Sequence, residues 1–179
     1  TDQLGHATTV TASFVVDATP PVVRITTPEV DQLFNAAPIT VSGTVSDENA
    51  VSVFVNGVTA VVQNGTGGTG SSGGVRTFVA SGVPLGEGSN MLTAEAVDLA
   101  GNKAQDSRRV ALDTMPPLPF APVANPTGWT PVQTPTITFA TTDATSGVDH
   151  YELKIDDGAY VTATSPYTLP PLADGIHPI

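Results

Sequence analysis

An internal repeat with a period of 96 residues constrains this chain more than any other feature. Both copies contain a turn followed by a Pro-Pro motif: AVDLAGN at 96–102 with DTMPP at 113–117, and TDQLGH at 1–6 with DATPP at 17–21. Asp2 aligns with Asp98, and Asp17 aligns with Asp113, without a gap. A repeat at a fixed period is typical of a tandem array, so the limits of each unit are the first question.

Composition favours short strands and tight turns. Only 13% of the 179 residues are charged, and the chain has 17 Gly, 16 Pro and no Cys, which excludes disulfides and thiolate metal sites. The net charge of −11 argues against nucleic acid as a partner, because such binding requires basic residues that neutralise phosphates. No signal peptide or long apolar run is recognisable, so membrane insertion is not expected.

Residues 22–113 are predicted to form one complete unit. Apolar and polar side chains alternate in seven short runs, a pattern typical of strands with one buried face. These runs are 22–25, 38–45, 51–55, 58–62, 77–80, 91–97 and 108–112. Asn56-Gly57 predicts a hairpin turn because both positions need positive φ, and 64–74 predicts a mobile loop. Seven strands in about 100 residues indicate an immunoglobulin-like β-sandwich, so the predicted fold class is all-β.

Residues 1–17 are predicted to be the closing strand of a neighbouring sandwich. Four apolar side chains alternate with other residues over 9–16, namely Val10, Ala12, Phe14 and Val16. Such a strand cannot stand alone in water, because its backbone groups and its apolar face need partners. Val10, Ala12 and Phe14 stand where the internal copy has Asp106, Arg108 and Val110, so this strand is the more apolar of the two.

The remaining segments are two linkers and a second, incomplete unit. Residues 18–21 and 114–119 contain Pro-Pro pairs, which stiffen the backbone and cannot continue a ladder. Residues 120–179 are predicted to form a sandwich that lacks its closing strand, because 172–179 matches 85–92, the start of the penultimate strand of the complete unit. A second copy of residues 1–17 restores most of the missing part, apart from counterparts of 93–96.

Two hypotheses explain this register. In the first, the N-terminal strand of one molecule is inserted into the C-terminal unit of the next, which gives a head-to-tail filament. In the second, the residues belong to a longer covalent array. Both hypotheses predict a chain of sandwiches whose partner is another copy of itself.

The motifs AVDLAGN, DTMPP, SGTVSD at 42–47 and VNG at 55–57 resemble those of bacterial immunoglobulin-like repeat domains of surface proteins and adhesins. Residues 20–116 are most similar to the glucodextranase domain B type, and 120–179 are similar to a sister type of surface repeat. The resemblance implies an extracellular stalk, spacer or adhesive repeat that has no catalytic activity of its own.

Calcium is the only metal that the sequence suggests, and no cofactor is expected. Oxygen ligands for calcium are available at Asp17, Asp47, Glu48, Asp98, Asn102 and Asp113. The alternative is that these residues only build turns and solvated loops, because Asp and Asn are common turn residues. The three histidines, His6, His150 and His177, are far apart in sequence and do not predict a metal site.

Catalysis is not expected. Every acidic residue is placed by the pattern in a turn or on an outward strand position, so no pair of carboxylates is predicted to share a cleft. A lysine–asparagine isopeptide bond is set aside because Lys154 alternates with apolar residues and Lys103 lies in a turn. Binding of a surface glycan or protein remains the alternative to a plain spacer, with Trp129, Tyr151, Tyr160 and Tyr167 as the aromatic candidates.

Overall fold

The computed structural model describes residues 3–49, 51–63 and 74–179. These residues form strands β1 to β14 and no helix, so the all-β fold class is confirmed. No membrane-spanning helix is found among them. The loop predicted at 64–74 lies outside the described residues except for Gly74.

The chain divides into two compact units. Unit 1 comprises residues 1–32, 37–85 and 89–110, and unit 2 comprises residues 33–36, 86–88 and 111–179.

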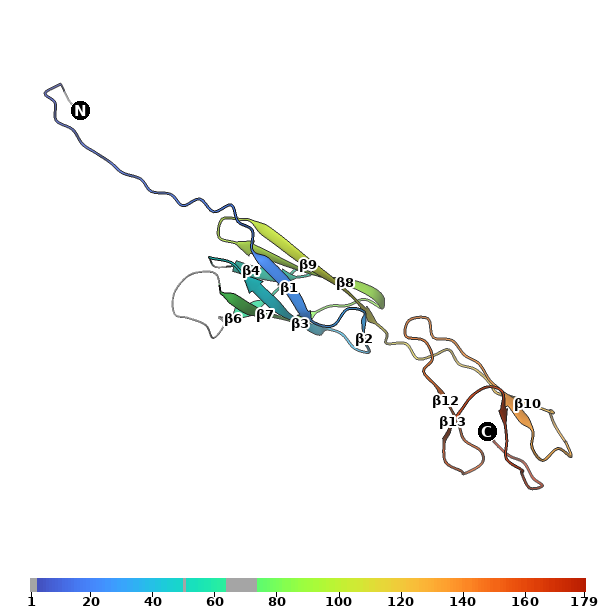
Figure 1. Ribbon diagram of the computed structural model, residues 1–179. Helices are drawn as coiled ribbons and strands as arrows, with labels where there is room; N and C mark the ends of the chain where they lie inside the picture. The colour runs from blue at the N-terminus through green and yellow to red at the C-terminus, as the bar shows by residue number, and fades with distance from the viewer. Residues whose placement is uncertain (1–2, 50, 64–73) are drawn as a thin grey trace. The chain divides into compact units, whose positions relative to one another are not determined.

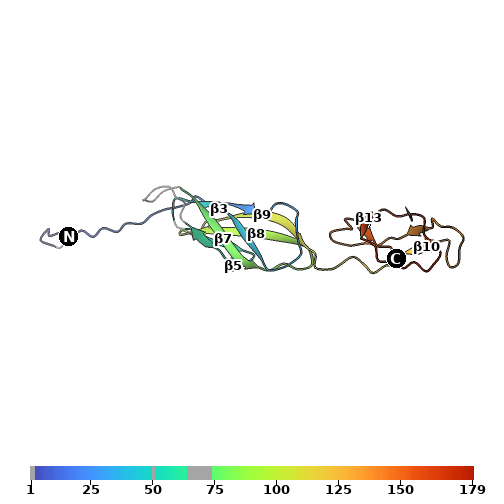
Figure 2. The same ribbon diagram turned by 90° about the horizontal axis from the view of Figure 1, so that it is seen from below.

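Among the described residues of unit 1, strands β1 to β9 form two layers around the core (Figures 1 and 2), and β2 runs parallel to β9, as the bonds Asp31 N–H to Arg109 O and Asp113 N–H to Phe34 O show. One sheet has the order β1 (Val22–Thr27), β3 (Ile39–Ser46), β7 (Val75–Val83) and β6 (Val61–Gln63). The other has the order β2 (Gln32–Phe34), β9 (Lys103–Leu112), β8 (Gly88–Asp98), β4 (Val51–Val55) and β5 (Val58–Thr59). Strands are present at all seven predicted runs, but the run 58–62 is divided into β5 and β6, which belong to different sheets, and β2 is an additional strand.

Alternation determines which face of each strand enters the core. In β3, Ile39, Val41, Gly43 and Val45 are buried, as the sequence predicts, while the residues between them are more exposed. In β4, Val53 and Val55 are buried, and the chain then reverses at Asn56 and Gly57, whose φ values are 46° and 83°. The predicted hairpin turn is therefore confirmed.

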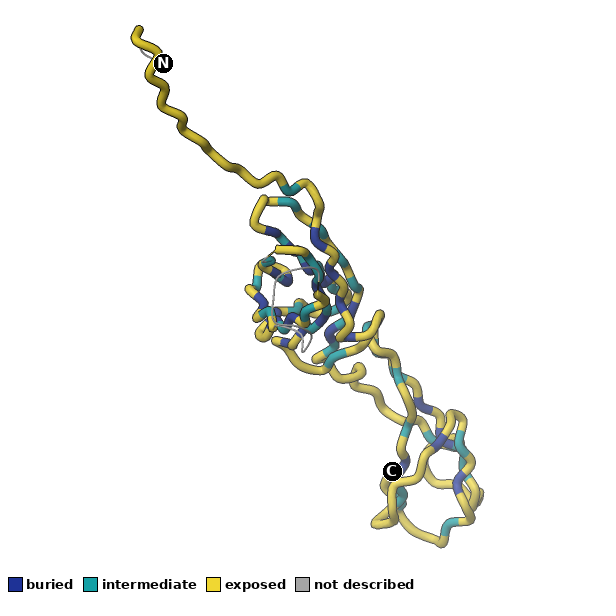
Figure 3. The backbone as a smooth tube through the Cα atoms, turned by 60° about the vertical axis from the view of Figure 1, so that its left-hand side comes forward, coloured by how far each residue is buried: buried dark blue, intermediate teal, exposed yellow. Residues whose placement is uncertain are grey.

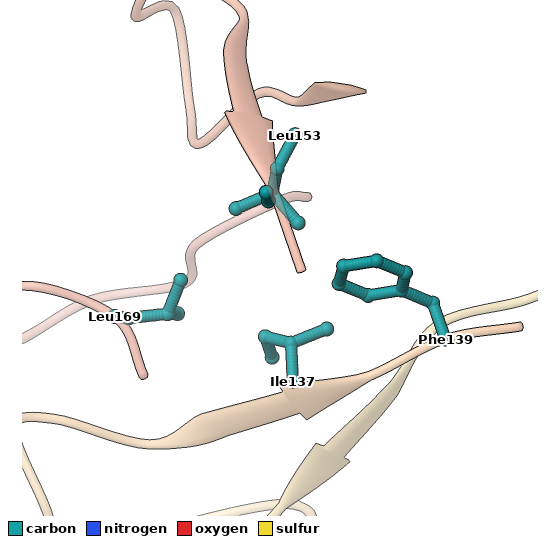
Figure 4. Packing of buried hydrophobic residues seen from close by; sticks show 5 residues of the cluster. Ile137, Phe139, Leu153 and Leu169 are labelled. Carbon is teal, nitrogen blue, oxygen red and sulfur yellow. The ribbon is translucent and has the colours of Figure 1, made fainter. Parts of the chain in front are cut away.

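Unit 2 contains five short strands in two small sheets. The first sheet has the order β10 (Val123–Asn125), β11 (Thr136–Thr138) and β14 (Tyr167–Thr168), and the second pairs β12 (Tyr151–Leu153) with β13 (Val161–Ala163). The core is a cluster of five buried side chains, which are Ile137, Phe139, Leu153, Ala163 and Leu169. Figure 4 shows four of them pointing toward one another from both sheets.

Residues 6–16 are exposed at every position, and Figure 3 shows this segment in yellow along its length. It pairs with no strand of the described residues. The sequence predicts a strand with one buried face here, and none of the residues that the structure describes covers this face. The prediction that the segment closes a neighbouring sandwich therefore stays a prediction.

Candidate functional site

A cluster of three carboxylates forms where the first linker meets unit 1. Asp17 precedes the Pro-Pro pair, Asp47 follows β3, and Asp98 ends β8. One oxygen atom from each of the three lies within 4.8 Å of the other two. The sequence predicts these residues as calcium candidates, and the fold brings these three together.

A tight turn between β8 and β9 holds Asp98 in place. Gly101 has a φ of 93°, which allows the backbone N–H of Gly101 to reach the Asp98 carbonyl oxygen at 3.3 Å. The Asn102 backbone donates to Asp98 Oδ1 at 2.8 Å, and the Asn102 side chain donates to Oδ2 at 2.8 Å. These bonds explain the Asp-x-x-Gly-Asn spacing of residues 98–102, whereas the copy at 2–6 has His6 in place of Asn102.

Asp98 is buried, with only 6% of its surface exposed. Asp98 brackets the turn where the sequence places it, but its burial is a feature that the sequence did not indicate. Desolvation by itself raises the pKa of Asp98, but the hydrogen bonds from Asn102, Gly101 and Ala100 outweigh it, so the pKa is lowered overall. Asp98 is ionised at neutral pH because its donors favour the charged form.

Two asparagines tie the linker to this end of the sandwich. Asn102 Nδ2 donates to the backbone oxygen of Asp17 at 3.1 Å, and Asn49 Nδ2 donates to Asp17 Oδ2 at 2.7 Å. The Asn49 backbone N–H donates to Asp47 Oδ1 at 2.7 Å. Three carboxylates could provide hard oxygen ligands to a divalent cation. The asparagine donors explain the same cluster without a cation.

Of the other three calcium candidates, Asn102 adjoins the cluster as a hydrogen-bond donor, and Glu48 and Asp113 lie outside it. Glu48 is exposed beside it. Asp113, the counterpart of Asp17, accepts hydrogen bonds in unit 2 from the backbone N–H groups of Met115 at 3.1 Å and Ser146 at 3.0 Å. Each linker aspartate is thus bonded to a loop after a strand: Asp17 to Asn49 in the loop after β3, and Asp113 to Ser146 in the loop after β11.

The aromatic candidates separate into two groups. Tyr151 packs its ring 4.9 Å from Phe139 and 5.8 Å from Phe120, and its hydroxyl accepts from the Thr141 N–H at 3.0 Å. Tyr167 packs against the core of unit 2. These two tyrosines are structural. Trp129 is fully exposed and Tyr160 mostly so, which leaves them as the aromatic side chains available to a ligand.

The histidines pair with separate acidic residues. His150 Nδ1 lies 2.6 Å from Asp149 Oδ2, and His177 Nδ1 lies 2.9 Å from Asp156 Oδ2. Hydrogen bonds to Asp156 and to the Ala173 carbonyl raise the pKa of His177. These local ion pairs give no sign of a shared histidine metal site.

Unit 2 has a groove of about 320 Å³ that sequence analysis did not predict. Its apolar lining comes from three segments of the unit. Phe120 and Pro122 lie before β10, and Ile179 is at the end of the given sequence. Phe139 follows β11, and Tyr151 and Leu153 belong to β12. Among the described residues β12 pairs with β13, and the backbone N–H of Asp156, after β12, donates to the Pro178 carbonyl oxygen at 2.9 Å. Charged side chains also line the groove, namely Glu152, Lys154 and Asp156.

The comparison with known families agrees with this architecture. The family described as glucodextranase, domain B matches residues 21–114, which is more than half of the chain. The chain belongs to this family. The resemblance inferred over 20–116 is confirmed, and domains of this family are non-catalytic immunoglobulin-like sandwiches. A search of curated proteins found no match.

Proposed function

We propose that this chain is a non-catalytic structural segment of an extracellular protein, in which successive β-sandwiches act as a stalk or spacer. The observation that carries the proposal is the repeated anchoring of the linkers. Asp17 is bonded to Asn49 and Asn102 in unit 1, and Asp113 is bonded to Ser146 in unit 2. A Pro-Pro linker that is also fixed by hydrogen bonds has little freedom to bend, which suits a spacer.

Family membership supports the absence of catalysis. The domain type that matches residues 21–114 is non-catalytic. In the acidic cluster, Asp98 is bonded to Asn102 and Asp17 to Asn49, so these carboxylates hold turns and the linker together. The proposed role requires no cofactor.

Antibody labelling of the organism that makes this chain tests the proposed location. An antibody raised against residues 22–113 is expected to label intact cells or their external fibres. Labelling that requires permeabilised cells would contradict an extracellular role.

A surface-binding role is the second candidate, and the exposure of Trp129 favours it. Exposed aromatic rings are common in glycan sites because they stack on apolar sugar faces. If the chain binds a surface glycan, Trp129→Ala or Tyr160→Ala should reduce retention on a glycan array at least tenfold. Tyr160 also has Lys154 at 5.9 Å from its ring centre, a contact that the second substitution removes. A plain spacer predicts no retention for any of the three proteins.

A further inference from the structure

The Asn56-Gly57 turn between β4 and β5 contains a dipeptide that is chemically reactive. Asparagine is a thermolabile residue, and it deamidates most readily before glycine, because glycine has no side chain to shield the backbone nitrogen that attacks. Asn56 and Gly57 are both exposed to water. The turn therefore has the sequence and the solvent access that deamidation requires.

Deamidation at this turn has two steps. The backbone nitrogen of Gly57 forms a bond to Cγ of Asn56, and its proton passes to Nδ2, which leaves as ammonia. The result is a succinimide ring. Water then opens the ring at either of its carbonyl carbons, so the product at position 56 is aspartate or isoaspartate. Water is the only other reactant, and nothing is oxidised or reduced.

Hydrogen bonds to β8 restrain Asn56. Its Nδ2 donates to the Met91 carbonyl oxygen at 3.1 Å, and its Oδ1 accepts from the Thr93 backbone N–H at 2.9 Å. The Asn56 backbone N–H donates to the Thr93 carbonyl oxygen at 3.1 Å. Met91 and Thr93 both belong to β8, so the Asn56 side chain adds a cross-link between the hairpin and this strand. Rotation of the side chain breaks both of its bonds.

The backbone of the turn also opposes ring closure. Asn56 and Gly57 have φ values of 46° and 83°, as a two-residue hairpin with positive φ at both central positions requires. A succinimide ring joins Cγ of one residue to the nitrogen of the next, so the backbone torsion between them must leave the turn geometry as the ring forms. Ring closure therefore requires the tip of the hairpin to separate from β8.

We propose that Asn56-Gly57 is a conformationally controlled deamidation site: the folded hairpin prevents the reaction, and separation of its tip from β8 permits it. The product reinforces that separation. A carboxylate at position 56 has no hydrogen to donate, so the bond to the Met91 carbonyl oxygen is lost and two oxygen atoms face each other. The inference concerns the chemistry of unit 1 and goes beyond the proposed structural role.

Peptide mass spectrometry of the 179-residue chain tests the proposal. The chain is incubated at pH 8 in guanidinium chloride or in sodium chloride of equal concentration, and conversion at position 56 is followed by the mass change from NH₂ to OH. We expect conversion in the folded chain to be slower by about tenfold or more, because only molecules with an open turn react. The rate should increase with the concentration of guanidinium chloride. A folded rate within about twofold of the denatured rate overturns the proposal.

Ala100→Asn is the matched control within the same folded unit. It places an asparagine before Gly101, which has a φ of 93°, in an exposed turn that lacks the Met91 and Thr93 partners. Position 100 should convert faster than position 56 in the folded variant, and the two rates should be similar in denaturant. Equal rates in the folded variant would show that folding in general slows the reaction, and they would overturn the role of the β8 bonds.

Asn56→Asp tests the consequence of the reaction, because it reproduces the aspartate product. It should lower the urea midpoint of unit 1, since the Met91 carbonyl oxygen loses its donor. Gln63→Glu is the control, because it adds the same charge at an exposed position of β6, and it should lower the midpoint less. Equal midpoints for the two variants would overturn the anchoring of the turn by Asn56, on which the proposal rests.

Discussion

At the scale of single residues, Gly43 shows how the two units solve the same packing problem differently. In unit 1 a Cβ at Gly43 would lie 2.1 Å from the Arg24 carbonyl oxygen and 2.5 Å from the ring of Phe78, its cross-strand partner. In unit 2 the aligned residue is Phe139, whose backbone N–H is bonded to the small Ser165. The position that holds glycine in unit 1 is therefore occupied by a large buried side chain in unit 2.

Replacing Gly43 should disturb unit 1. We expect Gly43→Ala to lower the free energy of unfolding by about 1–3 kcal/mol, because the added methyl group overfills the core. Urea titration followed by circular dichroism measures the change. Gly74→Ala is the matched control, since no atom lies within 4 Å of a Cβ there, and it should change stability by less than about 0.5 kcal/mol. Equal effects of the two substitutions would refute this account of the packing.

Asp98 should contribute to the pH dependence of stability. Its hydrogen bonds lower its pKa in the folded state below the unfolded value of about 3.9, so folding favours the ionised form. The stabilisation is therefore complete above about pH 4 and is lost as the pH falls through the folded pKa. In urea titrations between pH 2 and pH 7, Asp98→Asn should show a weaker loss of stability in acid than the unaltered chain. An unchanged pH dependence would contradict the assignment.

At the scale of elements, β9 stabilises β1 through side chains as well as through the core. Arg108 donates to the Ile25, Thr26 and Pro28 carbonyls, so Arg108→Ala leaves three backbone acceptors without this donor. We expect a loss of about 1–3 kcal/mol in the free energy of unfolding. Arg109→Ala removes only an exposed ion pair with Asp31 and should have little effect in the same thermal or urea measurement. A larger effect at Arg109 would contradict this role for Arg108.

The sequence predicts elements whose signal lies in neighbouring residues, but it does not predict those that depend on contacts with distant parts of the chain. The Asn56-Gly57 turn and the alternation in β3 were predictable because sterics and burial act residue by residue. The short strand β2 was not predicted because its three residues show no alternation of apolar and polar side chains. Strand β10 was not predicted because it lies between Pro122 and Pro126, and prolines usually indicate a loop. The calcium candidates were found through the chemistry of their oxygens, but the burial of Asp98 and the unit 2 groove depend on tertiary packing.

At the scale of the whole molecule, the two units differ in the size of their cores. The cluster in unit 2 has five buried side chains, all of them between Ile137 and Leu169. Unit 1 buries many more, including Val41, Phe78 and Leu92, each without exposed surface. Because hydrophobic stabilisation scales with the apolar area that is buried, unit 2 should be the less stable unit. Two cores without shared members also predict that unfolding is not a single two-state transition.

A matched pair of substitutions tests this difference. Ile137 and Val41 occupy aligned positions 96 residues apart, and both are buried. Ile137→Ala should cost about 2–5 kcal/mol and lower only the first thermal transition in calorimetry, because its cavity opens in unit 2. Val41→Ala should lower only the second transition, since its cavity opens in unit 1. A single transition that responds to both substitutions would show that the cores unfold together.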